Sequence, residues 1–189
     1  MSMANTTTNF QFKILILIIF LEISDVRAYM INTCSYPEKS YLSEIRTNLL
    51  KIKTTDDESN NGRIAFIIAS AIAVKFNVHV DQHTITQHLN AKTQFQRKVS
   101  LLDIKQVVNE LGYSIDPVQT NTPFALQKLS HEILITQDSE QNFISLVGLH
   151  GANLYFIYGK FDREAIVCPV SKSAFLNRYT SNRFLIFKQ

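Results

Sequence analysis

The chain has 189 residues, of which 46% are hydrophobic and 19% are charged, the composition of an ordinary globular domain with one core. A formal net charge of +3 is spread along the sequence without a block of like charges, so no nucleic-acid partner is predicted. The sequence has no low-complexity tract and no internal repeat, which excludes a repeat architecture. One folded domain is therefore expected.

The N-terminus differs in kind from the rest of the chain. Lys13 is the only charge before an apolar run over residues 14–21, and the stretch ending at Ala28 has small or branched residues where a signal peptidase reads. The run is shorter than the ~20 apolar residues that a membrane span needs. We expect a cleaved signal peptide over residues 1–28, export to the periplasm or the extracellular space, and no membrane span after cleavage. An uncleaved N-terminal membrane anchor is the alternative.

The chain has two cysteines, Cys34 and Cys168. In an exported protein both lie in a compartment where disulfides persist. A bridge between them would close a very long loop, for which loop-closure entropy gives at most about 4–5 kcal/mol of stabilisation. Two free thiols are the alternative, because Cys168 lies in an apolar stretch that is typical of a buried strand. The sequence does not decide between the two.

Helical spacing of apolar residues appears first over residues 40–50, which predicts an amphipathic helix. Residues 62–76 are Ala-rich and apolar on nearly all sides. A helix of this kind is buried over most of its surface, and it is too short to span a bilayer. We therefore expect a central core helix at this place.

Two shorter helices are predicted from their capping residues. Asp81 follows an apolar residue and is placed as the N-cap of a helix over residues 82–90. Ser100 and Asp103 have the spacing of a capping box. The helix that they start ends at Gly112, because glycine readily takes the left-handed conformation of a helix end.

The second half of the chain changes to the patterns of β-strands. Strands are predicted over residues 113–118, 132–136, 142–147, 153–158, 165–170 and 184–187. A helical turn is predicted over residues 123–129, and Ser171 is predicted to cap a short helix that reaches residue 177. The segment 148–152 has the composition of a hairpin loop. Helices followed by an antiparallel sheet indicate an α+β domain.

The order of these segments resembles that of the bacteriocin-processing, double-glycine cysteine peptidases, which have a papain-like fold. In that family the nucleophilic cysteine stands at the N-terminus of a buried, Ala-rich helix. The segment Asn60-Asn61-Gly62 occupies this place here. Residues 99–113 resemble the third helix of the family, with its Leu-Gly ending, and residues 171–175 resemble its Ser-x-x-x-Phe helix.

The resemblance covers most of residues 57–189 and implies that residues 57–189 form a papain-like α+β domain with N-terminal helices packed on an antiparallel sheet. Residues 29–56 are then an N-terminal extension with one helix. No cofactor and no metal ion is implied. The resemblance implies a bacterial source, and no oligomeric state is predicted.

The residues that carry catalysis in the family are replaced in this chain. Asn61 stands at the position of the nucleophile, and Asn142 opens the strand that begins with the catalytic His in the family. Tyr158 stands where the family has the Asp of an Asp-Pro pair, and residues 53–59 lack the Gln that helps to stabilise an oxyanion. An amide is neither a thiolate nor a general base near neutral pH. The resemblance therefore implies an exported pseudopeptidase without catalytic activity.

In the family fold the end of the strand over residues 153–158 borders the substrate cleft. Asn60, Asn61, Asn142 and Tyr158 are therefore predicted to line a groove that binds a protein or peptide partner, unfolded or secreted, without cutting it. A groove filled by side chains is the alternative. Two other functions stay open, namely an active cysteine peptidase that processes double-glycine leader peptides and a structural subunit of an envelope or surface assembly.

Two further site hypotheses are weaker than these. Cys168 together with His150 or His131 would make a rearranged Cys–His site, although a mid-strand thiol in apolar sequence behaves as a small hydrophobe. A second hypothesis is a metal site of clustered histidines. Its members are His79, His83 and His88. No paired Cys or His-Glu motif accompanies them, so a solvated helix face is predicted instead.

Overall fold

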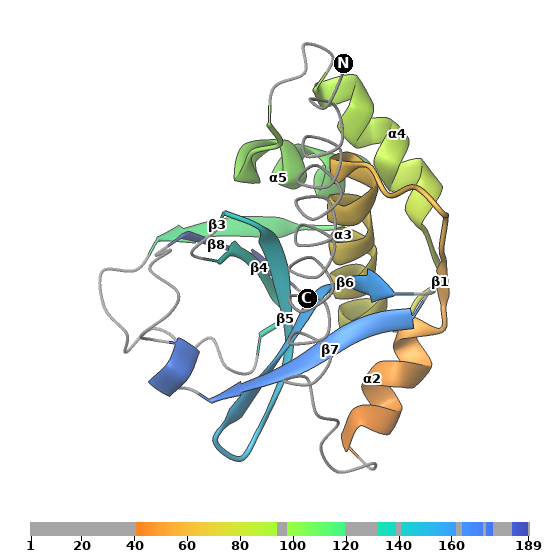
Figure 1. Ribbon diagram of the computed structural model, residues 1–189. Coiled ribbons are helices and arrows are strands. Elements are labelled where there is room, and N and C mark those ends of the chain that lie inside the picture. Colours follow the sequence, from red (N-terminus) through yellow and green to blue (C-terminus); the bar gives the residue numbers. More distant parts are fainter. Residues whose placement is uncertain are drawn as a thin grey trace, which may run out of the picture. The chain divides into compact units, whose positions relative to one another are not determined.

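The structure is a computed structural model in which two compact units are distinguished, residues 1–35 and residues 36–189. It describes residues 41–93, 98–119, 132–138, 141–161, 164–171, 173–175 and 183–188, all in the second unit. In this unit, helices that come first in the chain pack on a six-stranded antiparallel sheet (Figure 1). The predicted α+β class is confirmed. The predicted signal peptide and the turn predicted over residues 123–129 lie outside the described residues.

Helix α3 is the centre of the core. It spans Asn60–Phe76 and is preceded by α2, which spans Tyr41–Leu49 in the predicted N-terminal extension. Every residue of α3 from Ile64 to Ala73 is buried, as its apolar composition predicts. The helix ends at Asn77, which takes the left-handed conformation with φ 57° and donates its N–H to the carbonyl of Ala73.

Helices α4 (Gln82–Lys92) and α5 (Leu101–Glu110) begin at the predicted caps. The Asp81 side chain accepts a hydrogen bond from the N–H of His83. Ser100 and Asp103 form a complete capping box, in which each side chain accepts from the backbone N–H of the other, over 2.8 and 3.2 Å.

The sheet has the strand order β3-β8-β4-β5-β6-β7, and all neighbouring strands are antiparallel. Its strands are β3 (Ile115–Gln119), β4 (Leu134–Gln137), β5 (Phe143–His150), β6 (Asn153–Phe161), β7 (Glu164–Ser171) and β8 (Arg183–Phe187). Each of the six predicted strands is therefore confirmed, with ends that differ by a few residues. The sequence did not predict the short parallel pair β1 (Ile52–Lys53) and β2 (Val80–Asp81).

The hairpin between β5 and β6 is tighter than predicted. The predicted loop over residues 148–152 is wrong in length, because Gly148 and Leu149 still pair with residues of β6. Only Gly151 and Ala152 form the turn, and Gly151 has φ 59°, which favours glycine. Strands β5 and β6 are therefore longer than predicted.

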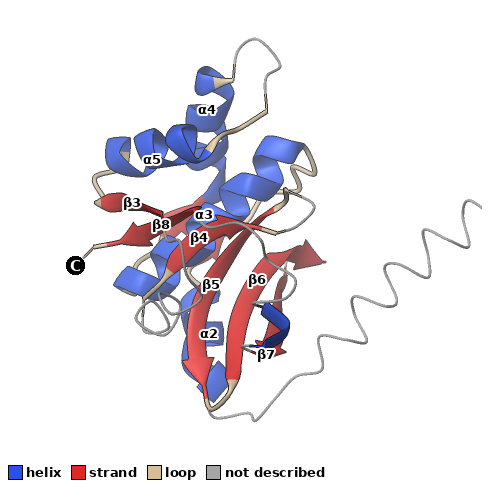
Figure 2. Cartoon of the chain, turned by 90° about the vertical axis from the view of Figure 1, so that its left-hand side faces the viewer, coloured by secondary structure: helices blue, strands red, loops and turns tan. Residues whose placement is uncertain are grey.

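The sheet has two apolar faces, because successive side chains of a strand point to opposite sides. One face packs on the helices in a first cluster that includes Phe143 and Ile157. The other face carries a second cluster, which contains no residue of α2 to α5. There the rings of Phe156 and Phe175 stack with centroids 5.0 Å apart, and Ser171 caps the turn before Phe175 by accepting from the N–H of Ala174. Figure 2 looks onto this second face, with α2 and α3 behind the sheet.

None of the helices in the described ranges is long and apolar enough to cross a membrane.

Candidate functional site at the start of helix α3

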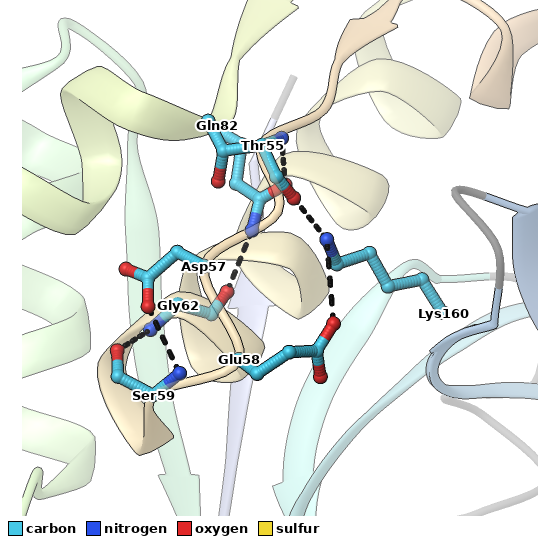
Figure 3. Close-up of polar contacts among 7 residues, drawn as sticks. All are labelled: Thr55, Asp57, Glu58, Ser59, Gly62, Gln82 and Lys160. Atoms are coloured by element: carbon cyan, nitrogen blue, oxygen red, sulfur yellow. Dashed lines mark hydrogen bonds and ion pairs between the residues drawn. The ribbon is translucent and has the colours of Figure 1, made fainter.

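The start of α3 is fixed by hydrogen bonds from the loop in front of it (Figure 3). Ser59 is the N-cap, and its Oγ accepts from the N–H of Gly62 over 3.0 Å. The N–H of Ser59 in turn donates to Oδ1 of Asp57 over 2.9 Å. These two bonds fold the loop back over the first turn of the helix.

Gly62 is required by this close approach. A Cβ atom at this position would lie 2.5 Å from the carbonyl oxygen of Asp57 and 2.6 Å from Asp57 Cγ. Both distances are far below van der Waals contact, so a larger residue would displace the loop. The close approach of the loop therefore explains why glycine occupies position 62, which the sequence alone did not show.

Gln82 joins the loop to α3 and α4 from the helical side. It is fully buried, its Nε2 donates to the carbonyl of Gly62 over 2.9 Å, and its Oε1 accepts from the N–H of Thr55 over 3.0 Å. Sequence reasoning missed Gln82 as a residue of this site. Gln82 follows the Asp81 cap at the start of α4, and this position in the sequence does not indicate that the side chain is buried.

Lys160 reaches the same loop from the sheet side. Its ammonium group donates to the carbonyl oxygen of Thr55 and lies 3.9 Å from Oε1 of Glu58. The Lys160 side chain is only 5% exposed, whereas Glu58 is 76% exposed. Thr55 Oγ1 is buried and has no hydrogen-bond partner among the described residues. Sequence reasoning missed Lys160 as well, because a lysine near the end of a strand normally extends into water.

Asn61, at the predicted nucleophile position, is bound to the end of α4. Its Nδ2 donates to Oδ1 of Asn90 over 2.7 Å and to Oγ1 of Thr93 over 2.9 Å. Asn60 is exposed on the first turn of α3. The amide of Asn61 thus makes interhelical hydrogen bonds at the place where the resemblance implies a nucleophile.

The two other predicted positions lie against different neighbours. Asn142 is exposed before β5, where its N–H and Nδ2 donate to the Asp138 carboxylate over 2.8 and 3.3 Å. Tyr158 packs against the second cluster, with its ring edge-on to Phe156 at a centroid distance of 6.3 Å. That cluster is on the face of the sheet away from the helices. A shared groove of Asn60, Asn61, Asn142 and Tyr158 therefore stays a prediction.

The carboxylate of Asp57 is stabilised in its charged form. Hydrogen bonds from the side chain and the backbone N–H of Ser59 lower its pKa below the ordinary 3.8, and the charges of Lys160 and His83 act in the same direction. A lowered pKa in the folded state means that the stabilisation is complete above pH 3.8 and is lost as the pH falls through the lower, folded-state value.

We therefore expect Asp57→Asn to destabilise the domain at pH 7, with a difference from the unmodified protein that shrinks as the pH falls below about 4. Urea unfolding at several pH values between about 2 and 7 measures this difference. Asp116→Asn is the control, since Asp116 forms an exposed ion pair with Lys188 on the sheet. A constant difference over the whole pH range would show that the Asp57 charge does not contribute.

Cys168 is buried on β7, 7% exposed, and is not a free thiol. A Cys–His nucleophile needs a free thiol, so the rearranged site with His150 or His131 is not formed. His150 is exposed at the end of β5, and His131 lies outside the described residues. Cys34 also lies outside them, so its pairing with Cys168 stays a prediction.

The histidines of the hypothetical metal site have other neighbours. His88 Nδ1 lies 3.0 Å from Oε2 of Glu110 on α5, and His83 Nε2 lies 3.0 Å from Nε2 of Gln87. In the part of the chain that the structure describes, no group of three or more His, Cys, Asp or Glu side chains is arranged to hold a metal ion.

The fold is similar to that of known peptidase domains. A double-glycine-motif protease from an AMS/PCAT transporter, solved in complex with the leader peptide, superimposes with a TM-score of 0.55 and 16% sequence identity over 71% of this chain and 89% of that chain. The peptidase domain of Streptococcus ComA, a bi-functional ABC transporter involved in a quorum-sensing pathway, gives a TM-score of 0.49 and 15% identity over 72% and 96%. No protein-family profile and no curated protein matches the sequence. The similarity to the double-glycine-motif protease shows that the chain contains a domain with the fold of that peptidase.

Proposed function

We propose that this chain is a non-catalytic, exported, peptidase-like domain that binds a protein or peptide partner. The observation that carries the proposal is the environment of Asn61. An amide stands at the N-terminus of the central helix, and its donor group is engaged with Asn90 and Thr93. A carboxamide in this role supplies neither a nucleophile nor a base for peptide hydrolysis.

The other polar groups around the start of α3 support the same proposal. Ser59 caps the helix, Gln82 joins the loop to α3, and Lys160 binds the Thr55 carbonyl. Each of these side chains therefore has a role in holding the fold. The side chains at this place thus hold the fold together, which supports the proposal that the peptidase fold serves binding here.

A peptide is the partner that the fold favours. The double-glycine-motif protease of similar fold was solved with a leader peptide, and a related surface on this domain would suit a peptide of the same class. The proposal places the mature protein in the periplasm or outside the cell, because the N-terminal segment has the pattern of a signal peptide.

A synthetic leader peptide that ends in Gly-Gly tests the proposal. We expect the mature chain to bind the peptide in a fluorescence anisotropy titration and to leave it intact in mass spectrometry after prolonged incubation. A peptide of the same composition in scrambled order is the control for specificity. Cleavage after Gly-Gly that iodoacetamide abolishes would show an active cysteine peptidase instead. Absence of binding, together with a stoichiometric partner that co-purifies, would favour a structural subunit.

A further inference from the structure

The loop of residues 54–59 is held from two sides. From the helical side, the fully buried Gln82 accepts from the N–H of Thr55. From the sheet side, Lys160 of β6 donates to the carbonyl oxygen of the same residue. Thr55 is therefore bound by one polar side chain from α4 and one from β6 (Figure 3).

Lys160 brings a charged group to Thr55, whereas Gln82 brings a neutral amide. An ammonium group has three N–H donors. Among the residues that the structure describes, Lys160 has one hydrogen-bond acceptor, the Thr55 carbonyl, and one carboxylate at 3.9 Å on the exposed Glu58. The carboxylate of Asp57 attracts the ammonium group as well, without an ion pair between the two. Burying a charge costs free energy unless the charge is well paired. In the described ranges, one acceptor therefore meets the three donors of this buried ammonium group, and neither carboxylate forms a hydrogen bond with it, which is a property expected of a contact that can open.

We propose that Lys160 is a latch that holds the loop of residues 54–59 closed against the end of β6. Release of the latch turns the ammonium group to water, where it is fully solvated, and exposes the inner side of the loop. The end of this strand is the place where sequence analysis predicts a peptide groove. If the proposed function is correct, the latch also controls access to that groove, but the latch itself does not depend on it.

Thr55 offers a reporter for the closed state. Its Oγ1 is buried and has no hydrogen-bond partner in the described ranges, so Thr55→Cys removes no side-chain hydrogen bond seen there and places a thiol under the closed loop. A buried thiol reacts with maleimide only when the loop opens. The reaction rate of this thiol therefore measures how often the latch is released.

The experiment compares the labelling rate of Thr55→Cys with that of Thr55→Cys/Lys160→Met in the mature chain under non-reducing conditions. We expect roughly tenfold faster labelling without the ammonium group, because local opening is no longer opposed. Lys160→Gln should give an intermediate rate, since its amide can still donate a hydrogen bond. Lys188→Met is the matched control, because Lys188 forms an exposed ion pair with Asp116 and should leave the rate unchanged.

Equal labelling rates with and without Lys160 would overturn the latch. If Lys160→Met does not fold, amide hydrogen exchange of residues 54–59 is measured in Lys160→Gln instead. Faster exchange confined to this loop would support the latch, and unchanged exchange would contradict it. Neither measurement uses a peptide. A failure of the latch is therefore distinguishable from a failure of the leader-peptide binding test.

Discussion

Replacing Gly62 with alanine is expected to destabilise the domain by about 3 kcal/mol, at the upper end of the usual cost of overpacking. The added Cβ would meet the carbonyl oxygen of Asp57 at 2.5 Å, and a backbone atom cannot move aside as the end of a flexible side chain can. This clash is relieved only if the loop moves away from the first turn of α3. The hydrogen bond between Asp57 and Ser59 and the one between Ser59 and Gly62 are then distorted together.

Urea unfolding followed by circular dichroism measures this loss, and Gly112→Ala is the matched control. Gly112 has φ 85°, and a Cβ added there would have nothing within 4 Å. Its substitution therefore costs only the strain of a left-handed residue, about 1 kcal/mol. The comparison separates steric contact from backbone strain. A Gly62→Ala protein no less stable than Gly112→Ala would show that the loop yields freely, and the close approach would then not be important for stability.

The parts of the fold that the sequence predicted are those determined by local chemistry. The Ser100 and Asp103 capping box and the Asp81 cap involve residues at most three apart, and the apolar surface of α3 is visible in its composition. The strands were predicted from short β patterns. The error in the hairpin concerned Gly148 and Leu149, because a glycine-containing stretch fits both a loop and a strand that contains a bulge.

The candidate site could not be predicted in the same way, because its contacts join residues far apart in the sequence. Lys160 meets Thr55 across 105 positions, and Gln82 meets Thr55 across 27. Nothing in the neighbours of Lys160 distinguishes it from a solvated lysine. The position of Asn61 was predicted by the resemblance, but its bonds to Asn90 and Thr93 depend on the packing of α3 against α4. Position in the chain was thus predictable, and side-chain partners were not.

Gln82 is the side chain whose removal is expected to affect the site most. Gln82→Ala should destabilise the domain by about 2–4 kcal/mol, because it leaves a cavity in the core and deprives the N–H of Thr55 of its acceptor. The exposed Gln87 on the same helix is the matched control, and Gln87→Ala should change the stability by less than about 0.5 kcal/mol.

Gln82→Leu separates the two contributions to this loss. Leucine fills most of the volume of glutamine but can neither accept from Thr55 nor donate to Gly62, so a loss close to that of Gln82→Ala indicates that the hydrogen bonds dominate. A loss close to zero in urea unfolding would mean that packing alone stabilises the loop. If the hydrogen bonds dominate, the loop depends on its polar contacts with α4, and Gln82→Leu should also speed the labelling of a cysteine at position 55. That coupling would identify the loop of residues 54–59 as one cooperative element between the helices and the sheet.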